Sequence, residues 1–165
     1  MRMRPTRVRR KERGVTFIEL VIVLGILSLL ASVVLPLGHI SNKRVKEFEL
    51  KSRLRIIRSA IDAYKKAYDD KRILNEIDRS GYPESLLELV EGVEDVKDPE
   101  GRMLYFLRRL PRDPMNDNEF LAPEETWETR AYEGDPDDFS GGEDVFDVRS
   151  MSTELALDGT EYREW

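Results

Sequence analysis

The sequence predicts an α+β protein in which one long N-terminal helix packs on a small antiparallel sheet. Three observations predict this fold class. Residues 20–35 (LVIVLGILSLLASVVL) form an uncharged apolar run, and apolar residues recur at helical spacing over residues 50–68. Residues 126–132 and 145–151 are short segments typical of strands. Because 165 residues suffice for about one domain, we expect the helix to pack on a single head.

The charges divide the chain into four parts. Residues 1–14 hold seven basic residues and one acidic residue, and residues 15–40 hold one formal charge, Glu19. Residues 41–79 hold 12 basic and 7 acidic residues, whereas residues 80–165 hold 8 basic and 24 acidic residues. A basic start, an apolar segment and an acidic body are the charge order of a membrane-inserted chain. An acidic body argues against binding of nucleic acid.

Composition excludes several kinds of site. The chain has no cysteine, which rules out disulfides, CxxC redox motifs and cysteine-based zinc sites. Its single histidine, His39, argues against a Ser-His-Asp triad or a multi-histidine metal centre. His39 follows the apolar segment directly, so we expect it at a membrane interface.

The apolar segment is long enough to cross a membrane. Residues 15–37, taken as helix, number 23 and span about 35 Å at ~1.5 Å per residue, against a hydrocarbon core of ~30 Å. The basic N-terminus is expected to stay in the cytoplasm. A secretory signal peptide is disfavoured, because it has a core of only about 7–15 residues followed by a small-x-small cleavage site. A plain anchor would not explain Glu19, since a carboxylate at the centre of such a helix costs roughly 2.5–3.5 kcal/mol.

The residues around Glu19 resemble a known processing signal. The stretch RGVTFIEL, with Gly14, Val15 and Glu19, is similar to the N-terminal signal of type IV pilins and type II secretion pseudopilins. The resemblance implies that a prepilin peptidase cuts after Gly14 and removes residues 1–14 as a basic leader. It also implies that the new N-terminus, Val15, is N-methylated, although the family most often has Phe there.

Glu19 has a physical role in this interpretation. The resemblance implies that its carboxylate pairs with the N-terminal amine of a neighbouring subunit in a filament. The amine has a pKa of about 8 in water, and Val15 and Glu19 lie one helical turn apart. Because an unpaired buried carboxylate is costly, such a pair would favour docking in one register. The alternative is that Glu19 simply reaches the membrane interface.

Small residues and a proline interrupt the apolar segment. Gly25, Ser28 and Ser32 fall on one helix face, where small side chains let membrane helices approach closely. Pro36 cannot donate a backbone hydrogen bond, and pilin-like proteins commonly have a proline there. We expect Gly25 and Pro36 to give this assembly helix, residues 15–40, flexibility.

Residues 41–72 are predicted to continue the helix as an amphipathic segment. Apolar side chains recur at spacings of four and three residues, and Val45 and Phe48 extend the pattern less regularly; the regular positions are Leu50, Leu54, Ile57, Ile61, Tyr64 and Tyr68. The regular stretch covers fewer than three heptads, so packing on the protein's own head is favoured over a coiled coil. We therefore expect one helix from residue 17 to about residue 70.

The remaining chain, residues 73–165, is predicted to form the head. Residues 84–92 are expected to form a short helix that ends at Gly92, and residues 102–110 either another short helix or an irregular segment. Pro111 and Pro114 exclude a central strand there. Residues 134–142 are a turn-rich connection between the two predicted strands.

The head extends the resemblance to the G-type major pseudopilins of type II secretion systems. Shared features are a Tyr82-Pro83 break, an LLELV segment and the stretch LPRDPMND at residues 110–117. The resemblance implies a structural subunit and not an enzyme: a homopolymer in a periplasmic pseudopilus. Its expected partners are prepilin peptidase, other pseudopilins, inner-membrane secretion components and membrane lipid. The expected location is the inner membrane, with a single pass and a periplasmic head.

Two acidic regions are candidates for metal binding. Many G-type relatives bind calcium in a loop before their last Trp, and the matching loop here, SMSTELALD at residues 150–158, offers Glu154 and Asp158 as calcium candidates. A second cluster is expected to be a solvated loop: Asp135, Asp137, Asp138, Glu143 and Asp144. Two alternatives stay open: a type IV pilus subunit, and a membrane-anchored calcium-binding or hydrolytic domain.

Overall fold

The computed structural model describes residues 14–74 and 79–165, and only the backbone of residues 33–39 within them. The chain divides into two compact units, Met1–Ser41 and Asn42–Trp165. Helix α1, Phe17–Asp69, enters both. The other elements all belong to the second unit: α2 (Glu88–Glu91), β1 (Val93–Glu94), β2 (Met103–Leu104), η1 (Glu124–Thr126), β3 (Trp127–Arg130), β4 (Asp147–Ser150) and η2 (Tyr162–Glu164).

Helix α1 ends one residue before the predicted position. The end is a Schellman motif, in which the Arg72 N–H donates to the Ala67 carbonyl (2.9 Å) and the Lys71 N–H to the Tyr68 carbonyl (2.8 Å). Lys71 takes the left-handed backbone conformation that this motif requires, with φ at 57°. The single predicted helix over residues 17–70 is therefore confirmed.

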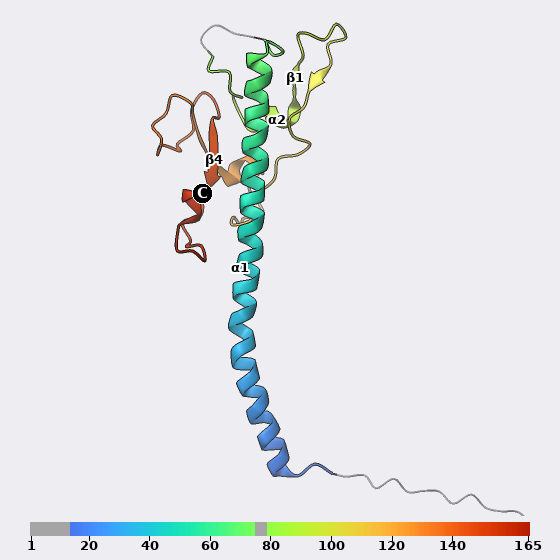
Figure 1. The fold of residues 1–165 in the computed structure, drawn as a ribbon, viewed down its shortest axis with the longest axis vertical. Helices are drawn as coiled ribbons and strands as arrows, with labels where there is room; N and C mark the ends of the chain where they lie inside the picture. The colour runs from blue at the N-terminus through green and yellow to red at the C-terminus, as the bar shows by residue number, and fades with distance from the viewer. Residues whose placement is uncertain (1–13, 75–78) are drawn as a thin grey trace, which may run out of the picture. The chain divides into compact units, whose positions relative to one another are not determined.

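The apolar stripe of α1 forms the centre of the second unit. The side chains of Leu50, Leu54, Ile57, Ile61 and Tyr64 are all buried. Buried residues from the rest of the unit surround them: Leu86, Leu89, Leu110, Trp127, Val145, Val148, Ala156 and Tyr162. Figure 1 shows α2, β1 and β4 around the cyan-to-green part of α1.

The stripe differs from the prediction at its N-terminal end. Phe48 is 76% exposed and Val45 is 57% exposed, so the core begins at Leu50. Ala60 and Ala67 are buried beside the predicted positions. Alanine is too small to stand out in a hydrophobic pattern, which is why the periodicity does not reveal it.

The two predicted strands exist and pair with each other. Strands β3 and β4 are antiparallel, with Trp127 opposite Ser150 and Arg130 opposite Asp147. Arg58 of α1 holds β4 in place, because its guanidinium donates to Asp147 Oδ1 (2.7 Å) and to the Val148 carbonyl (2.9 Å). The predicted antiparallel sheet against the helix is thus confirmed, in strands of four residues.

The region between α1 and β3 corrects one prediction and decides between two alternatives that the sequence left open. The helix expected over residues 84–92 is only the four residues of α2. Residues 102–110 do not form a helix, because β2 pairs antiparallel with β1, and the Phe106 and Leu107 N–H groups both donate to the Leu89 carbonyl. Gly92 permits this close approach: its φ is +80°, and a Cβ there would lie 2.8 Å from the Leu104 carbonyl oxygen.

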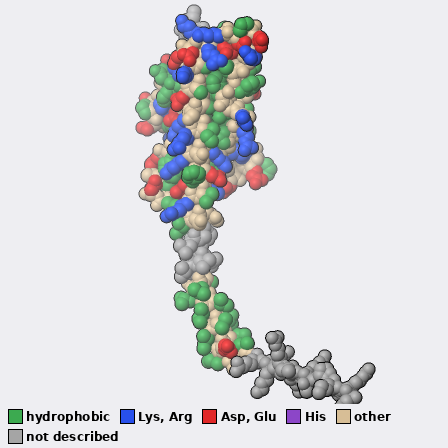
Figure 2. Space-filling view, turned by 45° about the vertical axis from the view of Figure 1, so that its right-hand side comes forward, with side chains coloured by type: hydrophobic (Ala, Val, Ile, Leu, Met, Phe, Trp, Pro, Cys, Tyr) green, Lys and Arg blue, Asp and Glu red, His purple; other side chains and the backbone are tan. Residues whose placement is uncertain are grey.

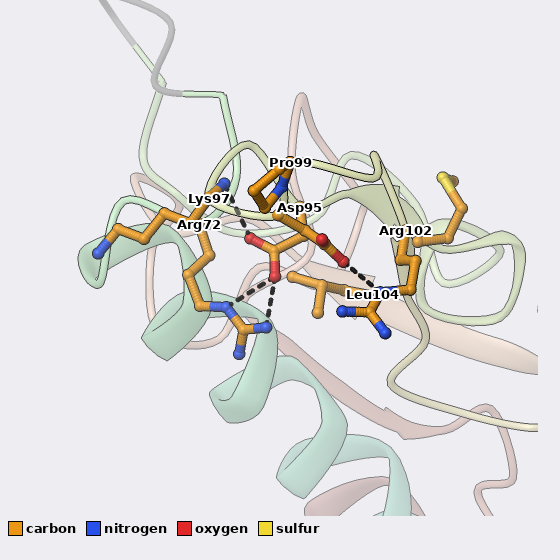
Figure 3. A pocket seen from close by; sticks show the side chains of 8 residues that line it. Arg72, Asp95, Lys97, Pro99, Arg102 and Leu104 are labelled. Carbon is orange, nitrogen blue, oxygen red and sulfur yellow. Dashed lines mark hydrogen bonds and ion pairs between the residues drawn. The ribbon is translucent and has the colours of Figure 1, made fainter.

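The β1–β2 hairpin is tied to the residues that follow α1. Arg72 donates twice to Asp95 Oδ2, from Nη2 at 2.5 Å and from Nε at 3.1 Å, and Figure 3 shows the two side chains pointing toward each other. The hydrogen bond from Arg72 lowers the pKa of the Asp95 carboxyl. Arg102 also forms an ion pair with Asp98, through its Nε. These groups line a shallow pocket of about 520 Å³, but the two ion pairs neutralise four of its charges, which marks them as structural.

The proline-rich segment at residues 110–117 is fixed by a buried carboxylate. Asp113 accepts hydrogen bonds from the Ser150 hydroxyl (2.5 Å) and the Met115 N–H (2.8 Å), which ties the segment to the end of β4. Burial raises the pKa of Asp113. The prediction that this segment is not a central strand is confirmed.

The C-terminal loop is held by three residues of α1 that are spaced one turn apart. Glu47 Oε1 accepts from the Leu157 N–H (2.7 Å) and from the Tyr162 hydroxyl (3.1 Å). The Lys51 ammonium lies 3.9 Å from the centre of the Trp165 ring, and Lys43 donates to the Leu155 carbonyl. Burial and the bond to Glu47 raise the pKa of Tyr162 to about 12.

A pair of adjacent isoleucines tests the assignment of the core. Ile57 is fully buried and Ile56 is 48% exposed. We expect Ile57→Ala to lower the free energy of unfolding by about 2–5 kcal/mol, because it removes buried methyl groups and leaves a cavity. Urea titration of the full chain in detergent, followed by tryptophan fluorescence, measures the change.

Ile56→Ala is the matched control, with the same chemical change one position away. It is expected to change the free energy of unfolding by about 0.5 kcal/mol or less. Equal effects of the two substitutions would show that the stripe is assigned to the wrong face.

The attachment of the C-terminal loop gives a second prediction. Glu47→Ala leaves the Leu157 N–H and the buried Tyr162 hydroxyl without their acceptor, so we expect a loss of about 1–3 kcal/mol in the free energy of unfolding. The same urea titration measures it.

Glu49→Ala provides the comparison on the same helix, because Glu49 makes only a partly exposed pair with Arg53. We expect it to cost about 0.5 kcal/mol or less. The chelator EDTA is expected to leave the unfolding curve unchanged, since protein groups hold this loop. A loss with Glu49→Ala as large as with Glu47→Ala would contradict the assignment.

Candidate processing and assembly site

The described part of the first unit is mostly helix, and no described residue covers its large apolar side chains. The large apolar residues from Val15 to Leu30 are all exposed, with Phe17 at 83%. Figure 2 shows hydrophobic side chains over this part of the chain with one acidic group among them. An apolar surface of this kind needs a partner other than water, either lipid or another protein.

The N-terminal end of α1 is capped by Thr16. The Glu19 N–H donates to Thr16 Oγ1 at 3.3 Å, and the Leu20 N–H donates to the Thr16 carbonyl at 3.1 Å. Thr-x-x-Glu is the pattern of a capping box. Thr16 is not among the predicted site residues, although this sequence pattern identifies it.

Glu19 lies in the first turn of α1, five residues after Gly14, where cleavage is predicted. A negative charge there is favoured by the helix dipole, by about 0.3–1 kcal/mol. Its side chain is exposed, and within the described residues no basic side chain pairs with it. The carboxylate is therefore available to a cation from another molecule.

Gly14 and Gly25 are not required by contacts within this chain. A Cβ at either position would meet nothing within 4 Å, and neither residue has a positive φ. Any demand for glycine at these two positions must therefore come from another molecule or from helix flexibility.

Of the other predicted residues of the helix, the two serines form hydrogen bonds within α1, and the side chains of the rest are not described. The Ser28 hydroxyl donates to the Leu24 carbonyl and the Ser32 hydroxyl to the Leu29 carbonyl, both at 2.8 Å. These bonds let polar side chains sit in an apolar helix. The side chains of Pro36 and His39 are not described, so the flexibility expected at Pro36 and the membrane-interface position expected for His39 stay predictions. Within the described parts of the chain, no helix reaches the length and apolarity of a membrane span.

The calcium candidates do not assemble a site. Both donor groups of Thr160 bond to Asp158 Oδ1, the N–H at 3.0 Å and the hydroxyl at 2.7 Å, and these bonds lower the pKa of Asp158. The described residues contain no cluster of three acidic or histidine side chains that could hold a metal. Because calcium takes six to eight oxygens, Glu154 and Asp158 do not fit it.

The second acidic cluster is a surface loop, as predicted. Asp135, Asp137, Asp138 and Glu143 are exposed. Asp144 differs, because its carboxylate accepts hydrogen bonds from the Tyr132 N–H (2.8 Å) and from the Ser80 hydroxyl. Its role is therefore structural.

The chain is similar to known proteins, both in its N-terminal motif and over most of its length. Residues 9–35 match the family described as the prokaryotic N-terminal methylation motif. The chain is 30% identical to the type II secretion system core protein G of Pseudomonas aeruginosa, over 82% of this chain and 92% of that protein. It is 28% identical to the proteins of the same name from Vibrio cholerae serotype O1 (81% of this chain, 87% of that protein) and Klebsiella michiganensis (82% and 87%).

No solved structure matches the chain significantly. The similarity to the core G proteins nevertheless covers 81–82% of this chain, and it supports the prediction of a structural subunit that is not an enzyme. The α+β fold with a long N-terminal helix agrees with it as well. On this evidence the chain belongs to the family of type II secretion system core protein G, the major pseudopilins.

Proposed function

We propose that this chain is a precursor of the structural subunit of a periplasmic pseudopilus in a type II secretion system. Prepilin peptidase removes residues 1–14, and Val15 becomes the N-methylated N-terminus. The processed subunit then polymerises through its apolar helix, together with other pseudopilins and inner-membrane secretion components. The filament helps to move folded proteins across the outer membrane.

One observation carries the proposal. The match to the methylation motif over residues 9–35 coincides with the start of α1, where Gly14, the Thr16 cap and Glu19 follow one another. A processing enzyme needs an accessible segment ahead of the helix. A Cβ at Gly14 would meet no described atom within 4 Å beyond its neighbours in the chain, and Gly14 lies three residues before the first residue of α1, Phe17. Both observations support cleavage at this place.

The distribution of charge supports a membrane location with the head in the periplasm. Residues 1–14 are basic and residues 15–37 carry one formal charge. Basic residues are retained on the cytoplasmic side of a membrane, so the head is exported in a single pass. Lipid would cover the apolar side chains of residues 15–32 before the subunit enters the filament.

The pair between Glu19 and a neighbour's N-terminus is the proposed force that sets the register of assembly. Cleavage creates an amine at Val15, and the exposed Glu19 carboxylate has no basic partner within the described residues. In apolar surroundings an unpaired charge is costly, whereas an amine and a carboxylate in contact largely offset each other. A subunit displaced by one turn would lose this compensation.

A type IV pilus subunit would carry the same N-terminal motif. The three relatives are all named as core proteins of type II secretion systems, which favours a periplasmic filament over a surface pilus. Calcium is not part of the proposal, because the residues that would bind it do not fit.

Substitution of Gly14 tests the processing step. We expect Gly14→Arg to abolish cleavage, because a long charged side chain would occupy the position recognised by the peptidase. Mass spectrometry and N-terminal sequencing of the protein from membranes provide the measurement. The wild-type protein should begin at a methylated Val15, and the variant should retain all of residues 1–14.

Gly25→Ala is the control for a glycine that also lacks neighbours. It is expected to leave cleavage unchanged. If the wild-type protein isolated from membranes still carries the arginine-rich leader, processing is disproved, and the assembly model loses its basis.

Substitution of Glu19 tests the assembly step. We expect Glu19→Ala to be cleaved normally but to reduce filament yield by about tenfold or more, since a charge pair in apolar surroundings is lost. Filaments sheared from cells and the secretion of a folded cargo protein in a complemented deletion strain are the measurements.

Thr16→Ala separates pairing from helix capping. It removes the side chain that caps α1 but keeps the carboxylate of Glu19, so we expect filaments close to the wild-type yield. If Thr16→Ala were as defective as Glu19→Ala, the role of Glu19 would be in the helix start. Normal filaments from Glu19→Ala would eliminate the proposed pair.

A further inference from the structure

The surface of α1 that faces away from the core of the second unit carries an uncharged line of side chains. Val45, Phe48 and Ile56 are exposed on it by 57%, 76% and 48%. Ser52 lies between them and is also exposed. These positions fall within about 80° of one another on a helix of 3.6 residues per turn, in a segment otherwise dense in charge. Large apolar groups gathered on one exposed face indicate a docking surface.

A row of basic residues runs along the edge of this line. Arg44, Arg55 and Lys66 are spaced 11 residues apart, which places them on one side of α1 at intervals of three turns, about 16 Å. All three are exposed, and none has an ion-pair partner within the described residues. Together, Arg44, Val45, Phe48, Arg55, Ile56 and Lys66 are called the outer face below. Figure 2 shows Lys and Arg side chains along the second unit beside hydrophobic ones.

The head carries the opposite charge on one ordered loop. Residues 133–143, the acidic loop, expose five carboxylates that have no basic partner within the described residues: Glu133, Asp135, Asp137, Asp138 and Glu143. Phe139 anchors the loop, since its ring lies 4.0 Å from the Arg149 guanidinium and 5.7 Å from that of Arg130. The Gly141 N–H also donates to the Thr129 carbonyl at 3.0 Å. The carboxylates are thus presented on a fixed support.

We propose that the outer face of one copy of this chain binds the acidic loop of a second copy. The inference rests on the proposed filament and adds a lateral contact between α1 and a neighbouring head. Charge complementarity identifies the occupant, because residues 80–165 hold 24 acidic and only 8 basic residues. Within one copy, no ion pair joins the basic row to the acidic loop among the described residues. A contact between two different surfaces of the same chain can repeat from copy to copy, and it builds an open helical filament when its rotation does not close a ring.

The two parts of the outer face have different roles. Phe48 and Ile56 supply an apolar centre from which water is expelled, and Phe48 is the largest exposed side chain on it. The basic row surrounds this centre and selects the acidic loop, because charges at the rim of an interface fix register and exclude wrong partners. The Glu19 pair and this contact would then hold each subunit at two places along α1.

Charge reversal in full-length chains tests the contact. We expect Arg55→Glu and Asp137→Lys each to lower the yield of filaments by about fivefold or more, because each places like charges opposite one another. The double variant R55E/D137K should recover most of the wild-type yield, since the pair is restored with inverted sign. Cleavage after Gly14 should be normal in all of these variants.

Matched controls have the same change of charge away from these surfaces. Lys97→Glu and Glu91→Lys alter exposed residues of the head that lack ion pairs within the described residues, and we expect wild-type yields from both.

A second measurement is disulfide cross-linking, which is possible because the chain has no cysteine of its own. Co-expressed Ser52→Cys and Asp137→Cys chains with different tags should form a mixed disulfide dimer on oxidation, whereas Ser52→Cys with Glu91→Cys should not.

The outcomes separate this contact from the proposed function. Wild-type yields from R55E and D137K, with Glu19→Ala defective, would overturn the contact and leave the filament intact. A defect of R55E that D137K does not rescue would mean that the outer face binds something else, such as anionic lipid, and would also overturn it. Absence of filaments from the wild-type chain would overturn both.

Discussion

The second unit depends on the burial of one stripe of α1. Leu50, Ile57 and Tyr64 lie at its centre, and burial of each such side chain contributes about 1.5–3 kcal/mol. The other regular elements have two to four residues, which is too short to be stable alone. They hold their shape because each covers part of the stripe, as Leu89 of α2 and Val148 of β4 do. The helix is therefore the template on which the head forms.

Polar contacts along the same helix decide how the covering segments are aligned. Arg58 reaches β4, Glu47 reaches the C-terminal loop, and the Tyr64 hydroxyl donates to Glu88 of α2 at 2.9 Å. Each of these bonds involves a charged group, so each is stronger than a neutral hydrogen bond. Apolar packing alone would tolerate a shift of a loop along the stripe. A charged partner at one turn of the helix opposes such a shift, because the shift would break its hydrogen bond.

The same constraint explains which surfaces remain for other molecules. The residues of the head pack against only part of α1, and this part begins at Leu50. The exposed side chains of residues 15–32 and the outer face are left over. In the proposed filament, this uncovered part of the helix is the expected place for lipid and neighbouring copies. The Thr16 cap and Glu19 give the first of these surfaces a defined start.

Some features of this protein follow from its local sequence pattern, and others are decided only by its tertiary structure. The sequence determined the long helix, the two main strands, the N-terminal methylation motif and the position of Glu19 as the single charge in an apolar segment, because all of these follow from local pattern. It could not determine that Phe48 is exposed while Ala60 is buried, or that residues 103–104 form a strand, because these depend on segments distant in the chain. For the same reason it could not show that Glu47 contacts Tyr162, or that Arg55 has no ion-pair partner within the described residues. Hydrophobic periodicity records which face of a helix is apolar, whereas the partner of each charged side chain is chosen only when the chain packs.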